Sequence, residues 1–256
     1  MSTLLAALAT LVFCAPGYPG GAGDAQALID QFTSAAVAIS GWPPGSLVSV
    51  YDPTEEGGLA KLRSAAAVLA FVPYPFFVEH AGELRLTPLV QADVTDIGPQ
   101  QRWTLVAKSG RVTGPASLQG FTILSVAGYA PNFVRHVALE GWALPPDVRI
   151  ESTGQILSAL RRVAAGERVA ALLDQSQAAA LASLPFAGDI KIVTQSAELP
   201  VALVAVVDSR LPAARAQALK AGLLRMGQAP QSADSLAPLR LRGFVQPRLP
   251  AHAATS

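Results

Sequence analysis

Short apolar runs alternate with helical segments along this chain, and the alternation limits its fold more than any other feature. The run "AAVLAFVP" at residues 66–73 is apolar on both faces, as expected for a parallel strand that is covered by helices on both sides. Strands separated by helices and short connections predict a doubly wound α/β unit. In the first part of the chain the expected strands are residues 10–15, 46–52, 66–73 and 83–92, with helices near 24–39 and 53–64.

The same alternation returns in the second half of the chain. A helix at residues 153–166 should stop at Gly166, because glycine favours helix ends. The 256 residues leave room for two lobes of roughly 100–150 residues each. We therefore expect an α/β fold of two doubly wound lobes. The further strands expected are 102–110, 121–125, 147–152, 167–174, 189–195 and 199–208, with helices at 114–120, from about 129, at 175–184 and at 212–226.

Composition and charge exclude several classes of protein. Hydrophobic residues make up 51% of the chain and charged residues 14%, so the chain is globular and not disordered. The net charge is +1 and no block of like charges stands out, whereas a nucleic-acid binder needs a basic face. One cysteine, Cys14, and three widely separated histidines give no metal-ligand spacing. We expect no metal, no cofactor and no nucleic-acid partner.

The N-terminal stretch "MSTLLAALATLVFCAPG" allows two interpretations. Its apolar part is near the length of a secretory signal core, although no Lys or Arg precedes it. The residues "LVFC" resemble a lipoprotein cleavage box, but Phe13 is too large for the position before the cysteine. The alternative is a buried first strand at residues 10–15. The Gly/Pro-rich turn that follows is typical of a strand exit and favours the strand.

Five segments occur in an order that carries more information than any one of them. They are "VLAFVPYPFFVEH", "WTLVAKSGRVTGPASLQGFTI", "SVAGYAPNFVRHVALEGW", "ILSALRRVAAGERVAALL" and "SLAPLRLRGF". In this order they resemble the periplasmic phosphate- and phosphonate-binding proteins of ABC importers, and the chain looks like a divergent member of that family. The first segment is similar to the family's strand followed by an aromatic turn. The third is similar to its helix start, with Ser125, Gly128, Tyr129 and Pro131 retained.

The resemblance implies the type 2 periplasmic-binding fold, with a ligand cleft between two lobes joined by a two-segment hinge. Lobe one would be residues 1–100 plus 203–256, and lobe two residues 101–202. The hinge would lie near residues 102–107 and 201–207. It also implies a non-enzymatic solute-binding protein that is exported to the periplasm and works as a monomer with an ABC importer permease. The weak signal segment leaves a cytoplasmic location open.

Several residues depart from the family pattern where ligand selectivity would be decided. Val126 and Ala127 replace a threonine and a serine of the helix start, and "ESTGQ", which contains Ser152, replaces a histidine. Ala170 replaces an acidic residue. The backbone amides at these positions remain available, but the hydroxyls of the family's threonine and serine are lost. A small anionic ligand, which could be phosphonate-like, another oxyanion or a carboxylate, therefore fits the resemblance.

The stretch "SVAGYAP" is the first candidate site. A helix start after small residues presents free N–H groups, so the amides of Ala127, Gly128 and Tyr129, with the Ser125 hydroxyl, could receive an anion. The alternative is that Ser125 only caps the helix.

Other candidates follow predicted strands. Tyr18, Tyr51 and Tyr74, like Tyr129, should lie in connecting turns, where they either contact a small organic ligand or cover the edge of a lobe. Asp174 should end a strand, where it either receives an amine or caps the next helix.

Two further functions stay open from the sequence. An enzyme on the same fold could use Cys14 as a nucleophile and Asp174 as a base, provided that a positive neighbour lowers the cysteine pKa. A degenerate pair of lobes could also serve as a sensor or interaction module, since side chains expected at the anion site are replaced.

Overall fold

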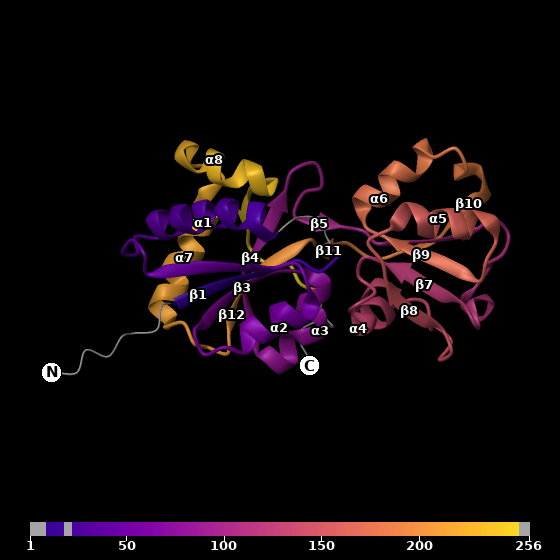
Figure 1. Cartoon of the computed structure of the whole chain (residues 1–256), viewed down its shortest axis with the longest axis horizontal. Helices are drawn as coiled ribbons and strands as arrows, with labels where there is room; N and C mark the ends of the chain where they lie inside the picture. Colours follow the sequence, from indigo (N-terminus) through magenta and orange to yellow (C-terminus); the bar gives the residue numbers. More distant parts are fainter. Residues whose placement is uncertain (1–8, 18–21, 251–256) are drawn as a thin grey trace. The chain divides into compact units, whose positions relative to one another are not determined.

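The computed structural model describes residues 9–17 and 22–250, which form two compact units (Figure 1). Of these residues, the first unit contains 9–15, 22–99 and 200–250, and the second contains 16–17 and 100–199. The chain thus contributes a short segment to the second unit after β1, forms most of that unit with residues 100–199, and then returns to the first. At the two points in the sequence where the chain passes between these long segments, β5 (Gln100–Gln101) and β11 (Leu199–Pro200) pair in a two-stranded sheet.

The first unit is built on a six-stranded sheet with the order β13-β4-β12-β3-β1-β2. Neighbours β2, β1 and β3 pair in parallel, whereas β12 runs antiparallel to both β3 and β4. The strands are β1 (Ala9–Cys14), β2 (Leu47–Asp52), β3 (Ala67–Pro73), β4 (Leu86–Val94), β12 (Ala202–Val207) and β13 (Leu241–Val245). Because β1, β2 and β3 are parallel, their carboxyl ends lie at one edge of this sheet.

Helices cover both faces of this sheet (Figure 1). Helices α1 (Ala22–Ile39), α7 (Ala213–Met226) and α8 (Ala233–Leu236) lie on one side, and α2 (Glu55–Arg63) and α3 (Tyr74–Leu84) lie on the other. Alternation along β1 serves both layers. Phe13 packs edge-on against Phe32 of α1, while Cys14 lies against Gly58 of α2. The side chains on both faces of β1 pack against helices, so the strand is apolar along most of its length.

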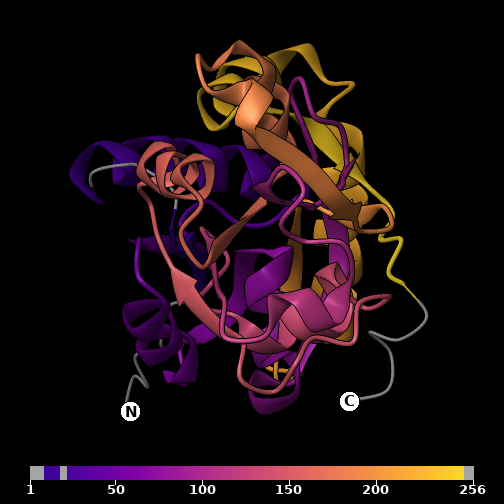
Figure 2. The same cartoon turned by 90° about the vertical axis from the view of Figure 1, so that its right-hand side faces the viewer.

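The second unit has a five-stranded sheet with the order β10-β6-β9-β7-β8 (Figure 2 turns this unit toward the viewer). Strands β8, β7 and β9 are parallel, and β6 runs antiparallel between β9 and β10. Its strands are β6 (Thr104–Lys108), β7 (Thr122–Ser125), β8 (Arg149–Ser152), β9 (Val169–Leu173) and β10 (Ile190–Gln195).

Helices of the second unit follow its parallel strands. Helix α5 (Ile156–Ala165) packs Leu160 and Val163 on one face of the sheet, and α6 (Gln175–Ala180) follows β9. On the other face, Trp103 and Phe133 meet edge to face at 5.3 Å. The remaining helical turns are η1 (Pro115–Leu118), α4 (Pro131–Phe133), the π-helical turn η2 (Val134–Ala138), and 3₁₀ turns at Leu181–Ser183 and Ala187–Asp189.

Several expectations about individual elements hold. The N-terminal stretch contains a buried strand, β1, and the predicted helix at 53–64 is α2, capped by Thr54. Helix α5 ends at Gly166, whose φ of +81° is the left-handed conformation that glycine adopts without strain. None of the helices within residues 9–17 and 22–250 is long and apolar enough to cross a bilayer.

Three expectations about elements are wrong. The aromatic turn expected after β3 is the eleven-residue helix α3, because aromatic and small residues there fill the space under β4 and β12. Tyr51 lies inside β2 and not in a turn, since β2 continues to Asp52. The helix expected from Tyr129 begins at Pro131, whose fixed φ suits a first helical position.

Candidate functional site

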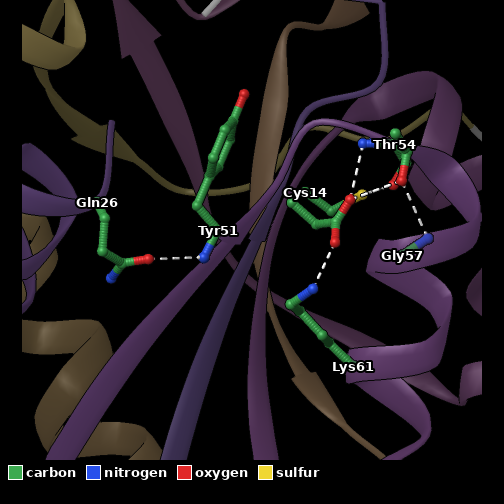
Figure 3. A network of polar contacts seen from close by, with 7 residues as sticks. Cys14, Gln26, Tyr51, Thr54, Gly57 and Lys61 are labelled. Atoms are coloured by element: carbon green, nitrogen blue, oxygen red, sulfur yellow. Dashed lines mark hydrogen bonds and ion pairs between the residues drawn. The ribbon is translucent and has the colours of Figure 1, made fainter. Parts of the chain in front are cut away.

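The carboxyl ends of β1, β2 and β3 bring polar residues together in the first unit. Helix α2 begins directly after β2, and α3 begins directly after β3. Ligands of α/β proteins commonly bind outside the carboxyl ends of parallel strands, so we regard this edge as the candidate site of the first unit. Figure 3 shows its polar contacts, in which Cys14, Thr54 and Lys61 belong to one network and Tyr51 bonds separately to Gln26.

Asp52 lies at the centre of that network. Its Oδ1 accepts hydrogen bonds from the Thr54 N–H at 2.9 Å and the Thr54 hydroxyl at 2.6 Å, and its Oδ2 forms an ion pair with Lys61 (Figure 3). Burial acts to raise the pKa of Asp52, but the hydrogen bonds from Lys61 and Thr54 outweigh it and hold that pKa below its ordinary value. Asp52 is therefore ionised at neutral pH, and its carboxylate fastens α2 to β2.

Two adjacent glycines allow this close approach. A Cβ on Gly57 would lie 2.2 Å from Oδ2 of Asp52, and a Cβ on Gly58 would lie 2.0 Å from Sγ of Cys14. Sequence reasoning missed this role. The signal was present in "EEGGLAKLR". Each glycine in a helix interior lowers helix stability, so two adjacent glycines indicate that close packing at this point requires them.

Cys14 is fully buried at the end of β1. Its thiol donates a hydrogen bond to the Thr54 carbonyl at 3.3 Å. Burial, with the negative charges of Asp52 and Glu55, raises the pKa of Cys14 to about 12. The thiol is therefore protonated at neutral pH, and the positive neighbour that a nucleophilic cysteine needs is outweighed here.

The position of β1 bears out the strand interpretation of residues 10–15. Strand β1 lies between β2 and β3, and Leu11, Val12, Phe13 and Cys14 are buried. Cleavage at a lipoprotein box before Cys14 would remove this inner strand. Residues 1–8, which carry the rest of the signal interpretation, lie outside the described residues.

His80 joins the same edge from α3 and was not among the predicted site residues. Its Nε2 lies 2.9 Å from Oε1 of Glu55, and its ring lies 4.6 Å from the ring of Phe76. A histidine six positions into an aromatic helix carries no sequence signal of an ion pair with a helix that starts 25 residues earlier. This pair ties α3 to the first turn of α2.

The predicted tyrosines have different surroundings. Tyr51 is half-buried, and burial, then Cys14 and Asp52, raise its pKa. Tyr74 is fully buried as the first residue of α3, where its ring stacks at 6.3 Å on Phe77 and burial raises its pKa to about 12. Tyr18 lies outside the described residues. Of the two described tyrosines of this unit, only Tyr51 is accessible to a ligand.

In the second unit, the parallel strands β8, β7 and β9 also end at one edge. This edge brings together Ser152 from β8, Ser125 from β7, and Asp174, which follows β9. Ser125 and Ser152 are directly paired in register. Ala127, Gly128 and Tyr129 follow Ser125 in the connection to α4, so the structure gathers all six predicted residues of this unit.

Hydrogen bonds within the turn engage part of the predicted anion cradle. The buried Ser125 hydroxyl donates to the Leu172 carbonyl at 2.8 Å and accepts from the Ala127 N–H at 3.1 Å. The Gly128 N–H donates to the Ser125 carbonyl at 3.1 Å. A Cβ on Gly128 would lie 2.2 Å from the Glu151 carbonyl oxygen, so only glycine allows this turn to pack on β8. Anion binding by this turn stays a prediction.

Asp174 caps α6. Its carboxylate accepts from the Gln177 N–H at 2.8 Å, and the Gln177 side chain accepts from the Asp174 N–H at 3.1 Å, which completes a capping box. Burial raises the pKa of Asp174 despite hydrogen bonds from the backbone of Gln177 and Ser176. No group of three or more potential metal ligands occurs within residues 9–17 and 22–250.

The sequence of residues 92–251 matches the model of a family described as the ABC transporter, phosphonate, periplasmic substrate-binding protein. The matched stretch is more than half of the chain. The chain belongs to this family. The resemblance inferred from the ordered segments is thereby confirmed, and the protein is a divergent phosphonate-type substrate-binding protein. No curated protein matches its sequence.

Solved structures share the fold of this substrate-binding protein. XAC2383 from Xanthomonas citri, bound to chloride ion, has a TM-score of 0.66 and 16% identity over 96% of this chain and 93% of its own. PhnD1 from Prochlorococcus marinus, in complex with methylphosphonate, has a TM-score of 0.56 and 12% identity over 93% of each chain. A binding protein component of an ABC phosphonate transporter (PA3383) from Pseudomonas aeruginosa has a TM-score of 0.54 and 14% identity over 92% and 81%. These likenesses establish the type 2 periplasmic-binding fold.

Proposed function

We propose that this protein captures a small ligand with an anionic group, such as a phosphonate, another oxyanion or a carboxylate, for an ABC importer permease. Its family supports the role of substrate-binding component. Structures of the same fold hold methylphosphonate in one case and arginine in another, so side chains and not the fold set the ligand class. We propose that it works in the periplasm as a monomer, with its two units as the two lobes.

The observation that carries the anionic class is the strand-end edge of the second unit. Ser152 is exposed there at the end of β8, next to Thr153, whose N–H donates to the Ser125 carbonyl and whose Oγ1 accepts from the Gln155 N–H. The carboxylate of Asp174 at this edge is buried and accepts the Gln177 N–H within its own helix cap, so it is not free to receive a ligand group. The accessible hydroxyl of Ser152 is therefore the group that favours a ligand that accepts hydrogen bonds.

An enzymatic role receives less support from the same residues. Cys14 is a buried thiol whose pKa is raised to about 12, and the Asp174 carboxylate accepts the hydrogen bond of a helix cap. Neither arrangement prepares a nucleophile or a base for a substrate. Binding without chemistry is therefore the function that we propose.

Calorimetry and thermal-shift measurements on the full chain test this proposal. The panel contains methylphosphonate, phosphite, methanesulfonate and acetate, with a neutral amide and a simple amine as contrasts. We expect one anion class to raise the melting temperature and Ser152→Ala to weaken its binding about tenfold, as for loss of a hydrogen bond to a charged group.

Ser109→Ala is the matched control. Ser109 is also an exposed serine of the second unit, but it follows β6, which runs antiparallel to β9 and so ends at the opposite edge of the sheet. Ser109→Ala should leave the affinity unchanged. A panel in which no anion raises the melting temperature, or in which only the amine does, would overturn the proposal.

A further inference from the structure

Asp52 is held by the set of donors that proteins use for phosphate and sulfate. A backbone N–H, a hydroxyl and an ammonium group, from Thr54 and Lys61, all point at this one carboxylate (Figure 3). The residue is 9% exposed, and α2, which begins three positions later, has nine residues. The protein therefore supplies its own anion to this set of donors.

The shape of α2 leaves room for that anion and for no second one. Gly57 presents no side chain where a Cβ would lie 2.2–2.4 Å from the carboxyl atoms of Asp52. The carboxylate thus fills the space that the missing side chain creates. A ligand oxyanion could reach these donors only by displacing Asp52 from Lys61 and from both Thr54 groups.

Charge at this edge opposes a ligand anion as well. Glu55 and Glu56 lie in the first turn of α2 and Asp52 lies three positions before that helix, so three carboxylates lie near its start. His80 is already paired with Glu55 at 2.9 Å. The negative charges reach the neighbouring thiol, because Asp52 and Glu55 both act to raise the pKa of Cys14.

We propose that Asp52 is a specificity-determining residue, which holds the donors at the start of α2 and so closes the first unit to the anionic group of a ligand. This inference rests on the proposed function and refines it. Of the two strand-end edges, the one in the second unit is then the edge open to an anionic group, whereas the edge in the first unit offers Tyr51 as its accessible aromatic side chain.

The test measures sulfate binding by calorimetry at constant ionic strength, balanced with sodium chloride. Asp52→Ala frees Thr54 and Lys61 and leaves a space over Gly57. We expect this variant to bind sulfate at least tenfold more tightly than the unaltered protein. The double variant Asp52→Ala with Lys61→Met should lose that gain.

Asp93→Ala is the matched control. Asp93 is a carboxylate of the same unit that pairs with Arg242 at 2.7 Å, but it lies on β4 and precedes no helix. Its loss also frees a cation, so equal sulfate binding by Asp93→Ala and Asp52→Ala would overturn the proposal. So would an unaltered protein that binds as many sulfate ions per chain as Asp52→Ala does.

A second variant guards against a failure of Asp52→Ala to fold. Asp52→Asn keeps the shape and the Oδ1 acceptor for Thr54, removes the charge and places an amide N–H₂ beside Lys61 in place of the acceptor, so we expect a smaller gain, about threefold, in sulfate affinity. No gain in this folded variant would contradict the proposal. Failure of the anion panel on the unaltered protein would end the proposed function but would leave the sulfate result intact, so the two can be told apart.

Discussion

Gly58 shows how strongly a single residue constrains the first unit. Alanine at this position places a Cβ 2.0 Å from Sγ and 2.8 Å from Cβ of Cys14, so α2 or β1 must shift. We expect Gly58→Ala to lower the free energy of unfolding by about 1–3 kcal/mol, although alanine is the better helix former. Chemical denaturation measures the change.

Gly82→Ala in α3 is the control for this substitution. A Cβ there meets nothing within 4 Å, so alanine should be neutral or should stabilise the protein by up to about 1 kcal/mol. Adding Cys14→Ala to Gly58→Ala removes the sulfur and should restore part of the loss. Equal effects of Gly58→Ala and Gly82→Ala would contradict the packing argument.

Asp52 and Asp174 should give opposite pH dependences of stability. The pKa of Asp52 is lower in the folded state than in the unfolded state. Its carboxylate therefore stabilises the fold above the unfolded-state pKa, and this stabilisation is lost as the pH falls through the folded-state pKa. The pKa of Asp174 is raised, so its contribution is largest at low pH and is lost as the pH rises through the folded pKa.

Denaturation of two variants between about pH 2 and pH 7 tests these signs. Asp52→Asn should reduce the loss of stability in acid, whereas Asp174→Asn should steepen it. Each unit of pKa shift corresponds to about 1.4 kcal/mol. Slopes that change in the same direction for both variants would show that at least one assignment of charge and burial is wrong.

At the scale of elements, the outer strand β2 is protected by a side chain of α1. Gln26 donates from Nε2 to the Ser49 carbonyl at 2.9 Å. Its Oε1 accepts from the Tyr51 N–H at 3.1 Å (Figure 3). These are the two bonds that one residue of a further parallel strand would make. The amide of Gln26 therefore occupies an edge that could otherwise pair with another chain.

We expect Gln26→Ala to expose this edge and to increase self-association, which sedimentation at several protein concentrations measures. Gln31→Ala is the control, because Gln31 lies on the same helix but bonds to the Asp234 carbonyl and not to a strand. The edge argument fails if both variants associate equally. Lost hydrogen bonds should also cost Gln26→Ala about 1–2 kcal/mol of stability.

The contrast between β1 and α3 shows how much of the fold the sequence could reveal. Apolar strands and the capped start of α2 follow from local patterns, and the order of segments revealed the family. The local pattern did not predict the start of α3. The segment "PYPFF" has the composition of a turn, but it is helical where α3 packs against β4 and β12. Likewise, the second-unit edge was predictable from strand ends, whereas the Glu55–His80 pair depends on packing between helices.

At the scale of the molecule, the inner position of β1 predicts which N-terminal residues the mature protein retains. We expect intact mass measurement of the exported protein to show that residues 9–14 are present and that Cys14 carries no lipid. A chain that begins at residue 15 should fail to fold, whereas one that begins at residue 9 keeps every described strand. A folded protein that lacks residues 9–14 would contradict the sheet order.

The sheet order of the first unit has a consequence for protein synthesis. Strand β12 lies between β3 and β4, yet the ribosome makes it more than a hundred residues after them. Until it emerges, β3 and β4 have no partner at their facing edges, while the whole second unit is already complete. We therefore expect the second unit to fold before the first unit is complete. Until then, the unpaired strands of the nascent first unit should depend on chaperones that shield them.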